Sequence, residues 1–485
     1  MVETIESTLS HLPSPPKNPL PYWQRLKTAR ALATGPELLR DSGGPVTRVV
    51  LGPKWLAPEI VVITSPQGAR DLLGRRDAFV DRGSLSMMAE LRQVVGGNLL
   101  NLVHDEWLPR RRALQPMFSK QNVPQFTGHI VEAAEHISRR WPQAGVVDLD
   151  QQLSELTMRA LSRSFLGVDL GAKGESVGSA MRRAFTWTAD RALAPMRAPM
   201  WFPTSARRRA YRGSALLHSY AAEVVRVCRT NPDHDAPAVR ALISARDPET
   251  GIALSDSEIC DELSMFMFGG HDTISTMLTY ALWQLGRHPE LQQRVADEAT
   301  AVGEQPLKAE DLPRLNYTVQ VLHEALRLCP PGPSLHRMVR QDVEVDGYRI
   351  KAGTIAVVGV YAMHRDPSLW DNPLEFDPDR FGSERSKDRD RWQFLPFSAG
   401  PHSCMGDHFA MLEATLALST IMRDIEVTST RGDFPIATPL TLVAAEPVRA
   451  QVRWRKCAVV RTNQSDDQIP GTDSCGPLGS KSESL

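Results

Sequence analysis

Closely spaced cysteines are missing from this chain of 485 residues. Its six cysteines, none of them in a C-x-x-C pair, stand at positions 228, 260, 329, 404, 457 and 475. Without such pairs, neither a zinc site nor a framework of disulfide bonds is indicated. The scattered spacing therefore favours a reducing, cytoplasmic setting.

A long apolar run near the start and an excess of charge of either sign are also missing. Residues 1–35 contain no stretch long and apolar enough for a signal peptide or a membrane span. Lysine plus arginine (56) nearly equals aspartate plus glutamate (57), so the overall charge gives no attraction to nucleic acid. Together with 42% hydrophobic residues, these features predict an ordinary soluble globular protein.

Residues typical of strands gather near both ends of the chain, whereas the middle, from about residue 66 to 330, is typical of helices. The dipeptide Asp346-Gly347 between two alternating arms predicts a tight hairpin turn. We therefore predict a mainly α fold with a small β-rich part assembled from both ends of the chain. The expected strands cover residues 46–51, 60–64, 343–350, 354–360 and 440–445.

This interleaving argues against sequential domains, and we expect one folded unit over residues 41–458. The proline-rich stretch from Leu12 to Pro16 predicts an extended lead-in over residues 1–40. Residues 459–485 are rich in Ser, Gly, Asp and Pro and poor in apolar side chains. Such a composition predicts a disordered tail.

One cysteine, Cys404, lies in a glycine-punctuated loop, from Phe397 to Gly406, that leads into a helical pattern near Asp407. Gly400 and Gly406 permit tight turns that a residue with a Cβ would resist. Free N–H groups at a helix start favour a thiolate, and a thiolate is a good ligand for a soft metal. The alternative is a buried cysteine that serves as a small hydrophobic side chain.

A second motif lies inside a predicted helix. Ser255 and Glu258 form a capping box, and apolar residues then continue at helical spacing into the run from Gly269 to Thr273. Two adjacent glycines cost a helix roughly 2 kcal/mol relative to alanine, so this helix needs either the space or a distortion. Thr273 could direct its hydroxyl toward a ligand. The alternative is a kinked core helix in which Thr273 bonds back to its own turn.

Glu324 and Arg327 lie three residues apart on one face of another predicted helix. Apolar neighbours indicate that the pair is buried, and a buried charged pair requires further partners. Arg380, in the stretch from Phe376 to Phe381, is the expected third member. The alternative is a surface ion pair of little energetic weight.

Together these motifs resemble those of the cytochrome P450 family of haem-thiolate monooxygenases. Four of them occur in that family's order and at about its spacing: Gly269 to Thr273, Glu324 to Arg327, Phe376 to Phe381 and Phe397 to Gly406. A fifth, Trp107-Leu-Pro-Arg-Arg111, resembles the family's early haem-propionate motif. The resemblance implies the cytochrome P450 fold and makes residues 41–458 the catalytic domain.

The resemblance implies that Cys404 is the axial thiolate ligand of the iron in haem b. Phe397 would pack beside the haem, and Gly400 and Gly406 would bring backbone amides near the sulfur. At position 402 the family often has Arg and sometimes His, as here. The groups expected to bind the haem propionates are Trp107, Arg111, Arg337 and His402.

Asp272 and Thr273 would be the acid–alcohol pair that the family uses to relay protons during the activation of O2. One position departs from the family pattern, because Ile274 follows where Thr or Ser is usual, with Ser275 next. The hydroxyl network is therefore expected to be thinner. The residues implied in a structural network behind the haem are Glu324, Arg327 and Arg380.

As a family member, the protein would insert one oxygen atom from O2 into an organic substrate. Mostly apolar segments at the family's pocket positions favour a lipophilic small molecule. No cysteine cluster for an iron–sulfur module is present, so electrons are expected from a separate ferredoxin, or a similar donor with its reductase. Basic residues on the thiolate side are expected to attract an acidic partner: Arg110, Arg112, Arg385, Lys387, Arg389 and Arg391.

Two rival functions and one local alternative stay open. A haem-thiolate isomerase, dehydratase or phenol-coupling oxidase is disfavoured by the intact Asp272-Thr273 pair, and a non-catalytic haem sensor or carrier is the other rival. Residues 192–213 combine apolar and basic side chains. We expect a substrate-entry lid there, with peripheral membrane contact as the less favoured alternative, because the prolines oppose a regular amphipathic helix.

Overall fold

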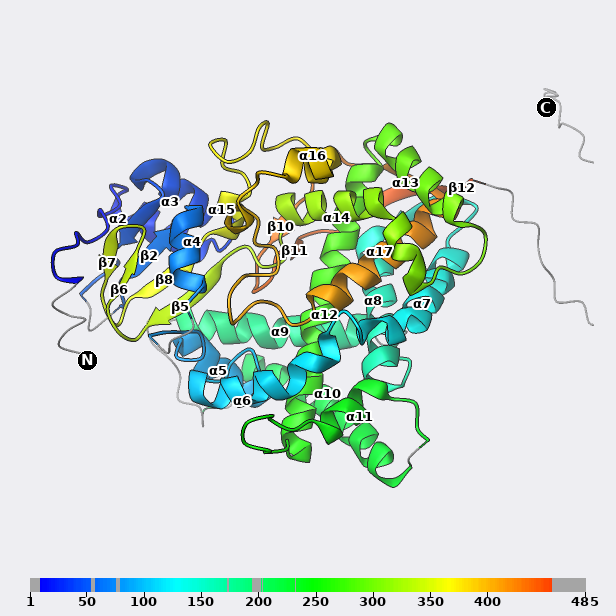
Figure 1. The fold of residues 1–485 in the computed structure, drawn as a ribbon, viewed down its shortest axis with the longest axis horizontal. Helices are drawn as coiled ribbons and strands as arrows, with labels where there is room; N and C mark the ends of the chain where they lie inside the picture. The colour runs from blue at the N-terminus through cyan, green and yellow to red at the C-terminus, as the bar shows by residue number, and fades with distance from the viewer. Residues whose placement is uncertain are drawn as a thin grey trace, which may run out of the picture.

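Helices dominate the molecule, and the strands gather mainly in a smaller region drawn at the left of Figure 1. The computed structural model describes residues 9–53, 57–75, 79–171, 174–193, 202, 204–231 and 233–455. The expected tail at 459–485 and residues 194–201 and 203 of the expected lid at 192–213 lie outside these residues. The mainly α fold with a small β-rich part is confirmed.

The largest sheet has five strands in the order β1-β2-β8-β5-β3. All neighbours in it are antiparallel except β2 and β8, which run parallel. Its strands are β1 (Val46–Val49), β2 (Ile60–Ile63), β3 (Val80–Asp81), β5 (Leu335–Val339) and β8 (Ile355–Val358). Segments nearly 300 residues apart therefore pair directly, as the distribution of β-branched residues predicts.

Three smaller sheets complete the β structure. The β6–β7 hairpin turns at Asp346 (φ 50°) and Gly347 (φ 76°), which is the tight turn expected from this dipeptide. Two strands, β4 here and β3 of the largest sheet, lie in the stretch that the sequence predicts to be helical. The strands are β6 (Val343–Val345) with β7 (Tyr348–Ile350), β10 (Ile436–Ala437) with β11 (Val443–Ala444), and β4 (Ala144–Asp148) with β12 (Arg449–Trp454) and β9 (Ile425–Ser429).

Two helices occupy part of the expected lead-in, namely α2 (Tyr22–Arg30) and α3 (Gly35–Gly43). α3 packs against β1 and β2 through its buried residue Leu39. The Asn18 side-chain amide donates a hydrogen bond to the Leu39 carbonyl oxygen at 2.9 Å. Residues from 18 onward are therefore packed into the folded unit rather than leading up to it.

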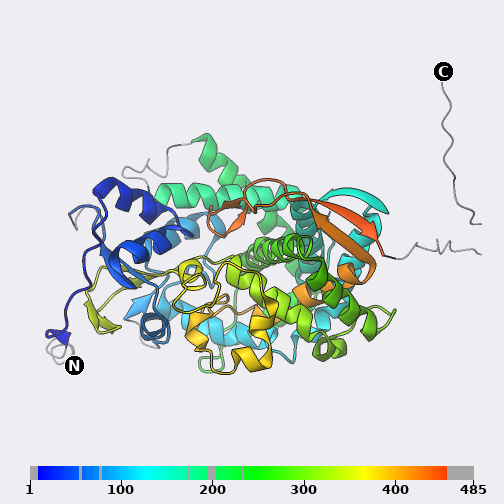
Figure 2. The same ribbon diagram turned by 90° about the horizontal axis from the view of Figure 1, so that it is seen from above.

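The helix α12 (Asp256–Leu285) forms the centre of the helical part, and it contacts helices on several sides (Figures 1 and 2). Ser255 and Glu258 form the expected capping box at its start. The helix runs unbroken through its two adjacent glycines. A Cβ on Gly270 would come within 2.8 Å of Leu161 in α8 (Leu149–Leu166). The glycine therefore provides space for a close helix crossing, not a kink.

The remaining long helices surround α12 or cover the sheets. None of the helices in the described ranges is long and apolar enough to cross a membrane. They are α4 (Pro66–Leu73), α5 (Ser86–Val95), α6 (His104–Leu114), α7 (Thr127–Arg140), α9 (Gly174–Leu193), α10 (Ser205–Thr230), α11 (Pro237–Ser244), α13 (Pro289–Val302), α14 (Asn316–Leu328) and α17 (Asp407–Asp424), with short turns α15 (Val360–Met363) and α16 (Ser383–Ser386).

Candidate active site

The loop that carries Cys404 folds back on itself before α17. The Cys404 N–H donates to the Phe397 carbonyl oxygen at 2.8 Å. Ser398 (φ 61°) and Gly400 (φ 71°) both adopt left-handed backbone conformations. A Cβ on Gly400 would lie 1.9 Å from the carbonyl oxygen of Leu73, so only glycine fits there. Close packing on α4 thus fixes the path of the loop.

Cys404 is the one exposed thiol among the four cysteines that the structure describes. Burial by neighbouring protein atoms raises the pKa of this thiol, although solvent reaches it, and this effect exceeds the opposing effects of the Gly406 N–H, Arg111 and Arg82. That a helix start favours a thiolate here stays a prediction, and a metal cation bound at the sulfur would favour the thiolate further.

Four cationic or potentially cationic side chains lie around the Cys404 loop, and we call them the cationic cluster: Arg82, Arg111, Arg337 and His402. Arg111, from α6, donates to the Ser403 carbonyl oxygen at 3.1 Å. Arg337, from β5, is 3% exposed. Among the described residues, no carboxylate lies within ion-pair distance of any of the three arginines.

The cationic cluster is electrostatically unfavourable in the protein alone. Burial and the neighbouring Arg82 lower the pKa of Arg337 to about 9, and burial lowers that of Arg82 to about 10. Burial, Arg82 and Arg337 lower the pKa of His402 to about 2, so this imidazole is neutral. Arg82 Nε and His402 Nδ1 are buried and have no hydrogen-bond partner in the described protein. The cluster therefore suits an anion with several oxygen atoms.

Trp107 supports this cluster from α6. Its ring is 2% exposed and lies 3.8 Å from the His402 ring, centroid to centroid, at an interplanar angle of 33°. The contact fixes the plane of the imidazole beside the Cys404 loop. The structure thus brings together all four residues that the sequence nominates for one anionic ligand, namely Trp107, Arg111, Arg337 and His402.

A second arginine cluster, which we call the brace, consists of Glu324, Arg327 and Arg380, and it is fully buried. Arg327 makes a bidentate pair with Glu324 at 2.7 and 2.8 Å, and Arg380 Nε reaches the same carboxylate at 3.3 Å. The remaining arginine nitrogens donate to backbone carbonyl oxygens of residues 364 and 371–375. The ion pair predicted from the helix spacing is therefore buried, as expected.

His364 links the brace to the Cys404 loop, and the sequence reasoning missed it. Its ring is buried, and burial with the nearby Arg327 lowers its pKa to about 3. In its neutral form Nε2 accepts the Leu395 N–H at 3.0 Å while Nδ1 faces the Arg327 carbonyl oxygen at 3.2 Å. No local pattern marks a histidine whose two partners lie 37 and 31 residues away.

On α12, accessibility follows one stripe of an otherwise buried helix. Partly exposed residues recur at helical spacing: Met265, Phe266, Gly269, Gly270 and Thr273. The Thr273 hydroxyl donates to the Gly269 carbonyl oxygen at 2.6 Å. Thr273 therefore bonds back to its own turn, as the alternative interpretation holds, and only its oxygen lone pairs remain to accept hydrogen bonds.

Asp272 points away from this stripe, toward α8 and α9. It is 4% exposed and pairs with Arg182 of α9 at 2.8 Å. The adjacent His271 is held by hydroxyls of α8, with Ser154 at 3.2 Å and Thr157 at 3.0 Å, and burial lowers its pKa to about 4. The expected acid–alcohol pair is thus not in mutual hydrogen-bond contact, because adjacent helical residues diverge by about 100°.

The expected basic docking face is largely neutralised within the protein. Arg110 pairs with Glu258 and Glu262, and Arg112 makes a bidentate pair with Asp247. Arg385 pairs with Asp377 at 2.8 Å, and Arg389 stacks over Trp370 and Phe381. Acidic residues distant in sequence thus balance the charges of Arg110 and Arg112, and the attraction of an acidic partner by this face stays a prediction.

A sequence model described as cytochrome P450 matches residues 13–454. The chain belongs to the cytochrome P450 family. Its relatives include cyclooctat-9-en-7-ol 5-monooxygenase of Streptomyces melanosporofaciens, 30% identical over 78% of this chain and 81% of the relative. Cytochrome P450 4V2 of Pongo abelii is 31% identical over 77% of this chain and 76% of that protein.

Solved structures agree with this assignment. The haem domain of cytochrome P450DA matches with a TM-score of 0.80 and 25% identity, covering 92% of this chain and 98% of that one. A cyanobacterial cytochrome P450 with bound retinoic acid matches with a TM-score of 0.77 and 22% identity, covering 91% and 100%. The protein is thus a cytochrome P450 monooxygenase with haem as its cofactor, which confirms the resemblance.

The donor set of this P450 fits haem. A haem carries two propionate carboxylates, and the cationic cluster offers buried N–H groups without a carboxylate of the protein to bind. Across the described ranges, no group of three or more His, Cys, Asp or Glu side chains could hold a metal ion. In haem the porphyrin nitrogens already coordinate the iron, so the protein needs to supply only one thiol ligand and a cationic site for the propionates. Arg82 belongs to this set, although no sequence motif pointed to it.

Proposed function

We propose that this cytochrome P450 inserts one oxygen atom into a lipophilic organic molecule. The supporting observation is the accessible stripe of α12, where Met265 and Phe266 adjoin two glycines and Thr273 is the polar residue. A relative is named as a monooxygenase of cyclooctat-9-en-7-ol, an alkenol, and this agrees with an apolar substrate for the present enzyme. The cytoplasm is the proposed compartment, since the four described cysteines are all free thiols.

Cys404 would be the protein's ligand to the haem iron, and the cationic cluster with Trp107 would bind the propionates. When bound there, the haem supplies the iron centre at which O2 is reduced and one of its atoms is transferred. Phe397, at the start of the loop, packs against the hydrophobic core, and the Gly406 N–H bonds to the sulfur. The brace of Glu324, Arg327 and Arg380 acts only by holding the segments that precede the Cys404 loop.

The test is product formation with labelled O2. Candidate lipophilic compounds are first ranked by the shift of the Soret band, and the best are turned over with a supplied ferredoxin and reductase. One labelled oxygen atom per product molecule is the expected result, and the Cys404→Ser protein should form none. An isomerised, dehydrated or coupled product without label would instead favour the rival enzyme functions, and no product at all would favour a haem sensor.

Asp272 and Thr273 are the proposed proton-handling residues. Thr273 Oγ1 keeps its own proton on Gly269 O, so its lone pairs can hold a proton-bearing neighbour in place. The Asp272 carboxylate must leave its ion pair with Arg182, at 2.8 Å, before it can approach the accessible stripe of α12. Asp150 is a second carboxyl group near Arg182 and Asp272, and burial raises its pKa to about 6.

Thr273→Ala should lower product formed per electron by about tenfold or more and raise hydrogen peroxide correspondingly, because the acceptor that holds a proton-bearing neighbour in place is lost. The measurement is product and peroxide per NADH consumed. Ser275→Ala, which removes a buried hydroxyl from another face of the same helix, is the matched control. Equal coupling in wild type and Thr273→Ala would contradict the assigned role.

Electrons are proposed to arrive from a separate ferredoxin or similar donor. A groove of about 1340 Å³ lies on the thiolate side, between α4, the start of α6 and residues 391–401. Its lining includes both Arg70 and Arg391 and both Asp71 and Glu344. Because these charges are mixed, the shape of the groove should contribute more to docking than net charge does.

A further inference from the structure

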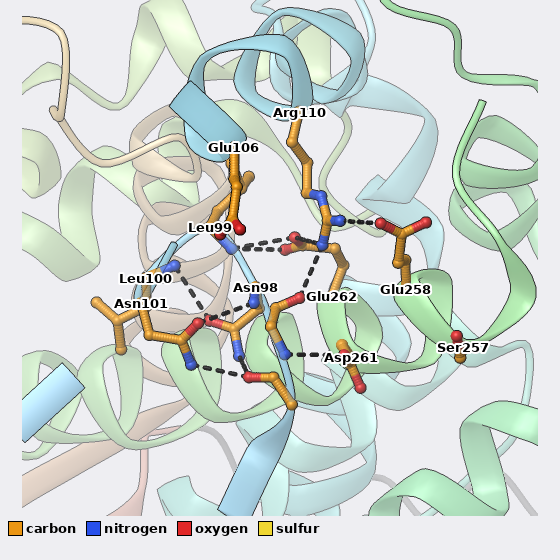
Figure 3. A network of polar contacts seen from close by, with 12 residues as sticks. Asn98, Leu99, Leu100, Asn101, Glu106, Arg110, Ser257, Glu258, Asp261 and Glu262 are labelled. Carbon is orange, nitrogen blue, oxygen red and sulfur yellow. Dashed lines mark hydrogen bonds and ion pairs between the residues drawn. The ribbon is translucent and has the colours of Figure 1, made fainter. Parts of the chain in front are cut away.

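The segment between α5 and α6, residues 96–102, is held mainly by side chains rather than by a strand or helix partner. The Leu99 N–H donates to both carboxylate oxygens of Glu262, at 3.0 and 3.2 Å. The Gly97 N–H donates to Asp261 at 2.9 Å, and Arg110 donates to the Gly97 carbonyl oxygen at 2.7 Å. Figure 3 shows Asp261 and Glu262 together on α12, with Arg110 reaching the same place from α6.

Glu262 is an energetically demanding residue in this position. It is 0% exposed, and burial raises its pKa to about 7 even though Arg110 opposes the shift. Arg110 lies 3.3 Å away and divides its charge between Glu262 and Glu258. A buried carboxylate that shares its only arginine with a second carboxylate stabilises the fold less than a well-packed apolar side chain would. A role beyond packing is therefore needed to account for it.

The carbonyl group of Leu99 connects this segment to Arg82 of the cationic cluster. The Leu99 carbonyl oxygen accepts a hydrogen bond from Arg82 Nη2 at 2.6 Å. Arg82 Nε, on the same guanidinium group, is buried and has no partner in the described protein. Leu99 is thus fixed through its N–H by Glu262, and through its carbonyl it fixes one edge of the Arg82 guanidinium.

We propose that Glu262 is a positioning residue for the haem carboxylates. It orients Leu99, Leu99 orients Arg82, and Arg82 then presents its remaining N–H groups to a propionate. This inference rests on the proposed propionate site and adds a residue of the distal helix α12 to it. No catalytic step is assigned to Glu262, which lies ten residues before Asp272 on that helix.

The test compares haem with haem dimethyl ester, whose propionates carry no negative charge. Apoprotein of wild type, Glu262→Gln, Glu262→Leu and the control Glu258→Gln is titrated with each. The control removes the other carboxylate charge beside Arg110 without touching Leu99. The second readout is hydrogen–deuterium exchange of the apoprotein in peptides that cover residues 96–102.

For Glu262→Leu we expect about tenfold weaker binding of haem, as for other groups that orient a ligand's partners. Binding of the dimethyl ester should be unchanged, and exchange in the 96–102 segment should be faster. Glu262→Gln keeps an acceptor oxygen for Leu99 and should recover most of the affinity. Glu258→Gln should resemble wild type in both readouts.

Three outcomes would overturn the inference, and they are distinguishable. If wild type binds haem and its dimethyl ester equally well, the propionate site itself is wrong. If wild type prefers haem and Glu262→Leu keeps that preference, only the role of Glu262 is wrong. An equal loss for haem and ester would reduce Glu262 to a structural residue. Should Glu262→Leu fail to fold, Glu262→Asp, whose shorter carboxylate keeps the charge but not the reach to Leu99, replaces it.

Discussion

The brace and the cationic cluster contain similar side chains in opposite electrostatic states. In the brace, Glu324 and backbone carbonyl oxygens satisfy Arg327 and Arg380 completely. In the cationic cluster, Arg82, Arg111 and Arg337 make no ion pair with a carboxylate of the described protein, and Asp81 offsets the charges of Arg82 and Arg337 only from a greater distance. Buried charges that the protein pairs itself indicate a structural role, whereas buried charges left without counter-charge indicate a ligand that brings it.

Removing a member of the brace should have the largest effect. Arg327→Leu leaves the Glu324 carboxylate buried with only Arg380, and it frees three carbonyl oxygens. We expect a loss of about 3–5 kcal/mol in the free energy of unfolding of the apoprotein. Urea titration followed by circular dichroism measures it. Arg226→Leu, which removes an exposed helix pair with Glu223, should leave the midpoint unchanged.

Removing a member of the cationic cluster should act in the opposite way on the apoprotein. Arg337→Met deletes a buried positive charge whose pKa burial has already lowered to about 9. The apoprotein should be as stable as wild type or more stable, while haem should bind about ten- to a hundredfold more weakly. Denaturant titration and haem titration of the same preparation measure both, with the exposed Arg340→Met as control. A destabilised apoprotein with normal haem affinity would erase the contrast between the two clusters.

The smallest effect concerns pH and His402. Its pKa falls from the ordinary 6.5 to about 2 in the folded protein, mainly through burial. Below about pH 6.5 the His402 side chain is therefore protonated in the unfolded chain but not in the folded one. The apoprotein loses stability as the pH falls below about 6.5. The contribution is at most about 1.4 kcal/mol per pH unit.

His402→Gln should accordingly flatten the dependence of the unfolding free energy on pH between about 7 and 4.5. The contributions of the other buried histidines to this dependence should be unchanged. Bound haem should flatten it in wild type too, because propionates beside His402 favour its protonated form. An unchanged slope in the variant would show that His402 is not buried among cations in solution.

Patterns in the chain were enough to predict the fold class, the capped central helix, the members of the brace and some of the strands, but not β3, β4, β5, β9, β10 or β12. The predicted features depend on short-range spacing: the hairpin dipeptide at Asp346, the capping box at Ser255, the three-residue interval between Glu324 and Arg327. The family resemblance nominated the members of the cationic cluster except Arg82. Local spacing is set by helix and strand geometry, so it can be read along the chain. The family assignment follows from the same kind of pattern.

Features that depend on distant partners could not be read in this way. Arg82 binds Leu99, His364 joins Arg327 to Leu395, and Arg110 and Arg112 are neutralised by acidic residues more than 130 positions away. Local spacing thus pointed to the family, and the resemblance to that family nominated the residues that are proposed to meet the haem. Packing decided which charges are left for a ligand, because charge balance in a protein interior depends on the groups that folding brings together and not on their order in the chain.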